Sequence, residues 1–339
     1  MKKFYSIMLS LILILSLMAG CTTTQNPPVS NADTNQKAED DLQEDNNNLE
    51  KKLSVYTSFY PMYDFASKVG GDKINVINMV PDGAEPHHWE PTPADIVGLE
   101  NASVFVYNGA GMEHWVEDVL ESIHNENLII VETADGLSLL EGHHHEHDDE
   151  DEHEEDEHED EEDEHGEFDP HVWLNPMNAK MQMESIKNAF VKADPENKDY
   201  YEANYTKYAA EFDALDKEFR DTLDPLPDKD IIVTHLAFGY LCSAYGLNQI
   251  AVEGLVPDSE PDPARITEII EFAREHNVRV IFFEELVNPK VAEVIADNIG
   301  AKTDVLSPVE ALSDEQRNNG DDYLAVMRQN LKALKAALE

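Results

Sequence analysis

The chain has 339 residues, of which 41% are hydrophobic, and a formal net charge of −47 at pH 7. It is long enough for two lobes of ordinary domain size, and most of it is apolar enough to fold around a core. A charge of this sign and size repels nucleic acid and anionic lipid head groups, so it excludes a nucleic-acid-binding protein and favours cations as small partners.

The N-terminus has the order of a signal peptide. Lys2 and Lys3 precede an apolar run, Met8–Met18, which is too short to span a bilayer comfortably as a mature helix. Small residues then lead directly to Cys21 in a way that resembles the bacterial lipoprotein pattern, although Leu17 stands one step earlier than the usual Leu. We therefore expect Cys21 to be lipidated and to anchor the chain to the membrane. The alternative is an ordinary signal peptide followed by a coincidental cysteine.

The chain has one other cysteine, Cys242. If Cys21 carries lipid, Cys242 has no partner for an intrachain disulfide, and its apolar surroundings predict a buried core thiol. Because thiols are so few, a cysteine-rich zinc site is excluded. Any metal site must therefore use histidine and carboxylate groups.

Short apolar, β-branched runs alternate with helical stretches from residue 53 onward. The predicted strands are 54–57, 74–80, 104–107 and 128–131 in the first half, and 231–233, 249–252, 278–283 and 303–306 in the second. This alternation predicts an α/β protein of two lobes, each a mostly parallel sheet flanked by helices. Residues 178–193 and 198–222 are predicted helices, and the second, free of Gly and Pro, would make a long rigid linker between the lobes.

Residues 141–168 differ from the rest, because they hold eighteen Asp and Glu residues and no Lys or Arg. Seven of the fourteen histidines of the chain also lie there: His143, His144, His145, His147, His153, His158 and His165. Such a composition cannot bury a core and predicts a solvated, mobile loop.

The predicted organisation follows from these segments. It comprises a signal peptide (1–20), a lipidated N-terminus and disordered tether (21–52), an N-terminal lobe (53–194) that contains the segment 141–168, a linker helix (195–226) and a C-terminal lobe (227–339).

His87 stands in a loop that follows a predicted strand and is punctuated by Pro and Gly. The loop leads into a helix start, with Thr92 as the N-cap, Pro93 at the first position and Asp95 in the capping-box position. Loops after the carboxyl ends of parallel strands are the usual ligand-binding places in α/β proteins. The loop is thus suited to hold His87 as a metal ligand, although a lone histidine decides nothing.

Two more histidines stand in comparable settings. His171 follows Asp169, whose carboxylate could orient the imidazole ring of a metal ligand. His235 follows the apolar strand 231–233. An ordinary surface histidine and a satisfied structural histidine are the alternatives for these two positions.

Together the three histidines indicate more than each does alone. Three imidazoles and one oxygen donor make a tetrahedral site suited to Zn²⁺. The four other histidines outside the segment 141–168 lack such settings, and two of them, His124 and His276, are expected to be surface helix residues. They are His88, His114, His124 and His276.

Four motifs resemble the zinc- and manganese-type solute-binding proteins of ABC transporters, also called adhesin-like metal-binding lipoproteins. The motifs are Thr57–Pro61, Glu85–Pro91, Asp169–Leu174 and Thr234–Tyr240. The resemblance covers nearly all of 53–339. It implies a monomeric capture protein, not an enzyme, that sits outside the cytoplasm on the bacterial cell membrane and delivers its metal to a membrane permease.

The resemblance also assigns ligands. The first falls on His87 rather than His88, and the second falls on His171. The third is histidine in zinc-type members and glutamate in many manganese-type members, so His235 favours Zn²⁺.

The fourth ligand is less fixed. Glu310 falls where family members supply an acidic residue from a C-terminal loop, while Glu284, Glu285 or a water molecule are alternatives. The His-rich segment recurs in zinc-type members, which implies weak zinc capture or zinc sensing there. The alternative is a segment that only concentrates cations.

The sequence therefore predicts an extracytoplasmic protein that binds Zn²⁺ in the cleft between its lobes and passes it to an ABC-type importer. Manganese or iron uptake by the same fold is one alternative, and a zinc-dependent surface adhesin is another. A zinc hydrolase is a third, because a three-histidine site with an open position can activate water. The chain lacks the paired helical histidines with an intervening glutamate that mark many metalloproteases.

Overall fold

The computed structural model describes residues 52–142, 167–256 and 262–339. The predicted signal peptide, Cys21, the tether and the seven histidines of the segment 141–168 lie outside the described residues. The described residues all belong to one compact unit, residues 50–339.

Two four-stranded sheets form the framework of this unit. The strands are β1 (Leu53–Thr57), β2 (Ile74–Asn78), β3 (Val104–Tyr107) and β4 (Ile129–Glu132) in the first sheet, and β5 (Asp230–Val233), β6 (Asn248–Ala251), β7 (Val280–Phe283) and β8 (Lys302–Val305) in the second. Their orders are β2-β1-β3-β4 and β6-β5-β7-β8, and every pairing is parallel. The predicted α/β class is confirmed, and the two sheets share one topology although the sequence has no apparent repeat.

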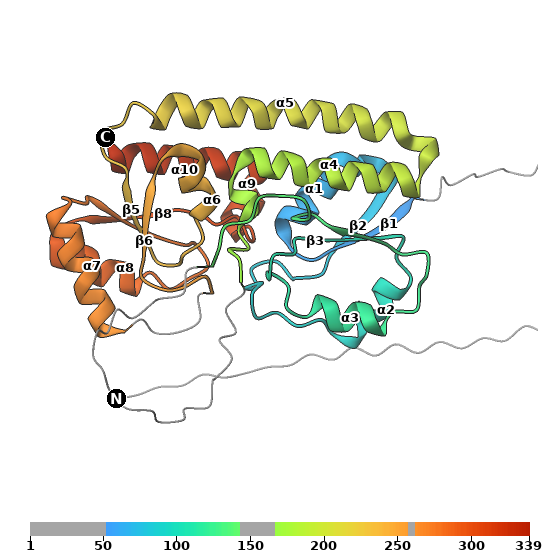
Figure 1. The fold of residues 1–339 in the computed structure, drawn as a ribbon, viewed down its shortest axis with the longest axis horizontal. Coiled ribbons are helices and arrows are strands. Elements are labelled where there is room, and N and C mark those ends of the chain that lie inside the picture. Colours follow the sequence, from blue (N-terminus) through green and yellow to red (C-terminus); the bar gives the residue numbers. More distant parts are fainter. Residues whose placement is uncertain (1–51, 143–166, 257–261) are drawn as a thin grey trace, which may run out of the picture. The chain divides into compact units, whose positions relative to one another are not determined.

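Helices cover both faces of each sheet. They are α1 (Tyr60–Gly70), α2 (Pro93–Glu100), α3 (Val116–Ser122), α4 (Pro176–Ala193), α5 (Lys198–Leu223), α6 (Gly239–Tyr245), α7 (Pro263–Glu275), α8 (Lys290–Ile299), α9 (Asp314–Asn319) and α10 (Tyr323–Leu338), with 3₁₀ turns at η1 (Gly71–Lys73), η2 (Val172–Leu174) and η3 (Pro195–Asn197). Figure 1 shows α1 and α4 on one face of the first sheet and α2 and α3 on the other.

Strand β5 of the second sheet shows why an inner strand has a run of apolar residues. Ile231 and Val233 pack into the cluster that includes α6 and α10, whereas Ile232 between them packs into the cluster that includes α7 and α8. Successive side chains of a strand point to opposite faces, so a strand buried on both faces must be apolar at every position. Cys242 of α6 is a buried free thiol, as predicted.

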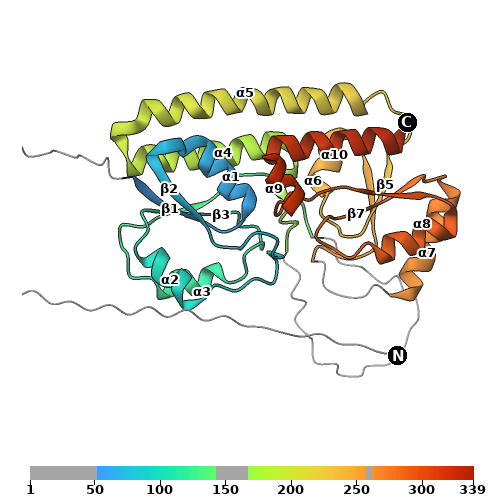
Figure 2. The same cartoon turned by 180° about the vertical axis from the view of Figure 1, so that it is seen from behind.

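Helix α5 lies alongside both lobes. Its buried residues repeat at helical spacing and are Tyr201, Ala209, Phe212, Leu215, Phe219 and Leu223. This face contacts α1, α4 and α10, and Figures 1 and 2 show α5 extending over α4 and α10 from both sides. The predicted long helix between the two sheets is confirmed, and one hydrophobic cluster continues from the first lobe into the second.

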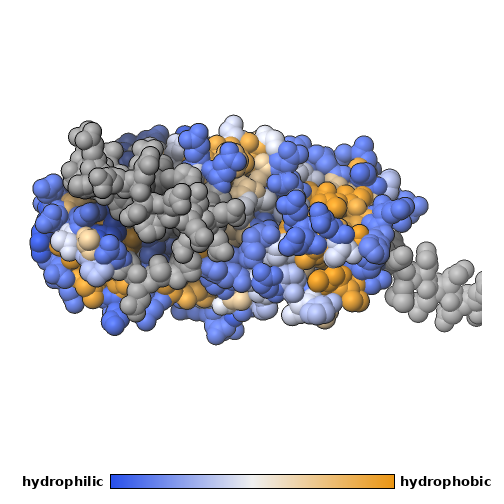
Figure 3. Space-filling model, turned by 60° about the horizontal axis from the view of Figure 1, so that its bottom comes forward, coloured by the Kyte–Doolittle hydropathy of each residue, from blue (hydrophilic) through white to orange (hydrophobic). Residues whose placement is uncertain are grey.

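The exterior is mainly polar. On the face shown in Figure 3, hydrophilic side chains surround several apolar patches. Among the described residues, no helix is long and apolar enough to cross a membrane.

Candidate metal centre

Loops at the carboxyl ends of the strands bring four side chains together. His87 lies between β2 and α2, His171 directly before η2, His235 shortly after β5 and Glu310 between β8 and α9. Two of these loops belong to each sheet. Parallel sheets collect ligand-binding loops at this edge, and here the two edges face a common centre.

The four side chains are buried and close enough to share one metal ion. One potential ligand atom from each lies within 4.8 Å of the others. The imidazole centroids are 5.3 Å apart for His87 and His171, 5.6 Å for His87 and His235, and 4.9 Å for His171 and His235. Oε1 of Glu310 lies 3.3 Å from Nε2 of His87 and 3.3 Å from Nε2 of His171. The structure thus brings together the four residues that the sequence analysis named.

Asp169 holds His171 from two directions. Its Oδ1 lies 2.8 Å from Nδ1 of His171 and accepts a hydrogen bond from the backbone N–H of His171 at 2.9 Å. The hydrogen bond from the backbone N–H fixes the peptide of His171. The contact at Nδ1 leaves Nε2 facing the centre, as expected for an oriented metal ligand. Nε2 has no hydrogen-bond partner of good geometry among the described residues. Burial would lower the pKa of His171, but its contacts with Asp169 and Glu310 outweigh burial and raise it.

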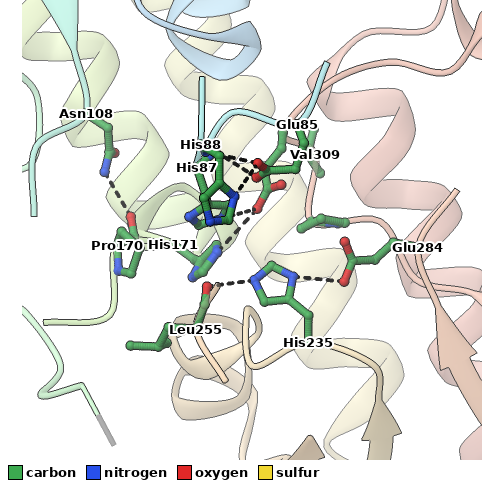
Figure 4. Close-up of polar contacts among 12 residues, drawn as sticks. Glu85, His87, His88, Asn108, Pro170, His171, His235, Leu255, Glu284 and Val309 are labelled. Atoms are coloured by element: carbon green, nitrogen blue, oxygen red, sulfur yellow. Dashed lines mark hydrogen bonds and ion pairs between the residues drawn. The ribbon is translucent and has the colours of Figure 1, made fainter. Parts of the chain in front are cut away.

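His235 is held in the same way by Glu284. Nδ1 lies 2.9 Å from Oε1 of Glu284, while Nε2 lies 3.0 Å from the carbonyl oxygen of Leu255, and Figure 4 shows the ring between these two partners. With Nδ1 bonded to the carboxylate, Nε2 is the nitrogen for a metal, which would replace the contact with Leu255. Burial would lower the pKa of His235, but the charges of Glu284 and Glu310 raise it to about 9.

Glu85 orders the loop that carries His87. Its two carboxylate oxygens accept hydrogen bonds from the backbone N–H groups of His87 (2.7 Å) and His88 (3.0 Å). At the far end of the loop, Thr92 and Asp95 form the predicted capping box of α2. The pKa of His87 is lowered, chiefly by burial, so its ring is the most readily available of the three as a neutral ligand.

Glu310 supplies the negative charge of the centre. Burial would raise its pKa, but the adjacent imidazoles of His87 and His171 hold it well below its usual value. The alternatives Glu284 and Glu285 lie outside the four-residue cluster. Glu284 contacts His235, and Oε1 of Glu285 accepts a hydrogen bond from Gln316 at 2.9 Å.

A pocket of about 450 Å³, open to solvent, borders the centre. Among its lining residues are four carboxylates, those of Glu85, Glu284, Glu285 and Glu310. A cation that enters here would meet negative charge before it reaches the buried imidazoles.

The remaining histidines of the described residues stand apart from the cluster. His88 lies 3.1 Å from Glu85, His114 lies 2.9 Å from Glu90, and His276 lies 2.6 Å from Asp230. His124 and His276 are exposed, as expected, but the expectation that they lie within helices is wrong. His124 follows the end of α3, and His276 caps the end of α7.

Sequence reasoning identified Asp169 as the partner of His171 but missed the partners of the other ligands. It did not identify the roles of Glu85 and Leu255, and it considered Glu284 only as a ligand. A signal was available for Glu85, because an acidic residue two positions before His87 can reach the N–H groups of a tight loop. The contact between Glu284 and His235 joins residues far apart in sequence, so no local pattern reveals it.

Three imidazoles and one carboxylate in a buried cluster match the donors and the coordination number of Zn²⁺. The donors come from two α/β lobes that meet at the cluster. Fold and site therefore define a two-lobed metal-binding protein.

Comparisons with known proteins identify the family. Residues 55–337 match the family described as zinc-uptake complex component A, periplasmic (ZnuA), and the chain belongs to this family. The high-affinity zinc uptake system protein ZnuA of Bacillus subtilis is 45% identical over 85% of this chain and 88% of its own length. The zinc-binding lipoprotein AdcA of Streptococcus pneumoniae is 37% identical over 84% of this chain, but the match spans only 55% of that longer protein.

A solved structure supports the fold and the metal. The Zn(II)-bound ZnuA-like domain of Streptococcus pneumoniae AdcA matches 85% of this chain and 99% of that domain, with 34% identity and a TM-score of 0.72. Members of the family are solute-binding proteins of zinc uptake systems.

Proposed function

We propose that this chain captures Zn²⁺ outside the cytoplasm with His87, His171, His235 and Glu310 and delivers it to the membrane permease of an ABC importer. One observation carries the proposal: three imidazoles and a carboxylate, all buried, offer ligand atoms within 4.8 Å of one another. The Bacillus subtilis relative is named for high-affinity zinc uptake, and the solved AdcA domain holds Zn(II).

The role is binding and not catalysis. A hydrolytic zinc site keeps an open position for water, whereas four protein donors complete a tetrahedral shell. We therefore expect no hydrolysis of ester or peptide substrates by the zinc-loaded protein.

Location and anchoring follow from the N-terminal sequence. We propose that Cys21 carries lipid, that the chain is a monomer and that the tether holds it at the outer face of the cell membrane. Mass spectrometry of the membrane-bound protein tests the anchor, because Cys21→Ser should abolish lipid attachment and release the chain.

Metal analysis of the purified protein tests the central proposal. Wild type should bind one Zn²⁺ tightly and retain it against excess Mn²⁺, whereas His235→Ala should lose most of that affinity. His276→Ala is a matched control, because this exposed histidine also contacts a carboxylate but lies outside the cluster. Equal zinc retention in wild type and His235→Ala would refute the assigned site.

The His-rich segment is proposed to collect zinc weakly for the buried centre. The described residues on its two sides pair directly, since the backbone N–H of Gly142 donates to the carbonyl oxygen of Glu167 (2.9 Å) and that of Asp169 donates to Leu140 (2.9 Å). Asp169 in turn holds His171, so the segment starts and ends beside the site. Deletion of residues 143–165 should remove weak extra zinc and leave one tight ion. Unchanged total zinc would contradict this role.

A further inference from the structure

Trp173 joins the two halves of the candidate centre. It lies in η2 shortly after His171, and its side chain is fully buried. Its indole Nε1–H donates a hydrogen bond of 2.7 Å to the carbonyl oxygen of Pro308, shortly before Glu310. One side chain thus connects the turn that carries a ligand from the first lobe to the loop that carries a ligand from the second.

Helix α10 closes this connection into a ring of hydrogen bonds. The hydroxyl of Tyr323 donates to the carbonyl oxygen of Trp173. On the same helix, Nδ2 of Asn330 donates to the carbonyl oxygen of Ser307 (2.7 Å), and its Oδ1 accepts from the N–H of Ser307 (2.9 Å). The path therefore leaves α10 at Tyr323, passes through Trp173 and Pro308, and returns at Asn330. All of its side chains are buried.

A strained turn follows the ring directly in the chain. Val309 has a φ of 58°, a left-handed conformation that is unfavourable for a β-branched residue. Such a turn persists where its surroundings hold it. Here the N–H of Val309 donates to Oγ of Ser307 (3.1 Å), and Trp173 fixes the preceding carbonyl group. The turn directs Glu310 at the imidazoles, since its Oε1 lies 3.3 Å from Nε2 of His87 and 3.3 Å from Nε2 of His171, and Figure 4 shows Val309 beside these rings.

We propose that Trp173 is a positioning residue that sets the separation of His171 and Glu310 and thereby favours Zn²⁺ over Mn²⁺. The inference rests on the proposed function, because it concerns the same ligands. Zn²⁺ accepts a compact tetrahedral shell, whereas Mn²⁺ suits additional oxygen donors. Aromatic contacts add to the constraint, with ring centroids 5.3 Å from His171 and 4.9 Å from Phe59. A rigid link between His171 and Glu310 should therefore weaken the binding of Mn²⁺, which needs a wider coordination shell, relative to that of Zn²⁺.

Trp173→Phe in the full chain tests this role, because it keeps an aromatic ring and removes the N–H donor. We expect zinc affinity, measured by competition with a chelator, to fall about tenfold, the effect of losing one well-aligned hydrogen bond. Mn²⁺ affinity should fall less, so the Zn²⁺/Mn²⁺ ratio should narrow. The visible absorption of bound Co²⁺, which reports ligand geometry, should change as well.

Trp115→Phe is the matched control. Trp115 is also buried, but its Nε1 has no hydrogen-bond partner among the described residues. The same chemical change there should leave the Co²⁺ spectrum and the Zn²⁺/Mn²⁺ ratio as in wild type.

Tyr323→Phe provides a second test, because it breaks the same ring at the hydroxyl and keeps the aromatic packing. It should narrow the Zn²⁺/Mn²⁺ affinity ratio as Trp173→Phe does. If Trp173→Phe does not fold, Tyr323→Phe alone tests the positioning role of Trp173. An unchanged ratio and Co²⁺ spectrum in the folded variant would overturn the positioning role. Failure of wild type to bind zinc would instead overturn the proposed function, so the two failures are distinguishable.

Discussion

At the scale of single residues, Glu310 and Glu285 provide a direct comparison of carboxylates. Both line the pocket, but only Glu310 belongs to the cluster with the three histidines. Glu310→Gln keeps the shape of the side chain and removes the anionic donor that neutral imidazoles cannot replace. We expect zinc affinity to fall by tenfold or more, about 1.4 kcal/mol at the least, in isothermal titration. Glu285→Gln should bind zinc as wild type does. If instead Glu285→Gln lost zinc affinity and Glu310→Gln kept it, the fourth ligand would be Glu285.

Protonation of the same histidines gives zinc binding its pH dependence. Its carboxylate neighbours raise the pKa of His235 to about 9 in the metal-free protein, so this ring holds a proton at neutral pH, and the pKa of His171 is also raised. Zinc must displace any proton that its ligands hold. Affinity should therefore rise about tenfold per pH unit for each proton displaced, until pH approaches 9.

The measurement is chelator competition between pH 6 and pH 9, with proton release followed in weak buffer. A flat affinity over this range would show that His235 is not a ligand. The folding stability of the metal-free protein should depend on pH in the opposite direction to zinc affinity. The raised pKa of His235 contributes stability that is present below its ordinary pKa and is lost as pH rises toward 9.

At the scale of elements, local patterns predicted most of the fold. All eight strands lie within a few residues of their predicted bounds, because β-branched apolar runs that alternate with helices leave few alternatives. Local patterns also predicted the capping box of Thr92 and Asp95. They could not predict the left-handed turn at Val309 or the contact of Trp173 with Pro308, since both depend on residues brought together only by folding.

The capping box allows a test at this scale. The side chain of Thr92 accepts a hydrogen bond from the N–H of Asp95 at the start of α2, directly after the loop that holds His87. Thr92→Ala should lower the free energy of unfolding by about 1 kcal/mol in urea denaturation. Thr206→Ala in α5 is the control, because that exposed hydroxyl bonds only to a carbonyl group within its own helix. Equal effects of the two changes would argue against the cap.

At the scale of the whole molecule, the two lobes share one hydrophobic interior. The largest cluster of buried residues includes Phe59 of the first lobe, Phe212 and Phe219 of α5, and Ile231 and Leu334 of the second lobe. Lobes that share a core lose it together when either unfolds. We expect the metal-free protein to unfold in a single calorimetric transition, and two separate transitions would show that the lobes are independent.

Zinc should then stabilise the whole unit. Its proposed ligands come from both lobes, so the unfolded chain cannot present them together, and a ligand that binds only the folded state stabilises it by RT ln(1 + [L]/Kd). At a free zinc concentration 100 times Kd this is about 2.7 kcal/mol, and the single transition should move to higher temperature without splitting. EDTA should reverse the shift, and His235→Ala should abolish most of it. A shift confined to part of the transition would mean that the metal binds one lobe and does not connect the two.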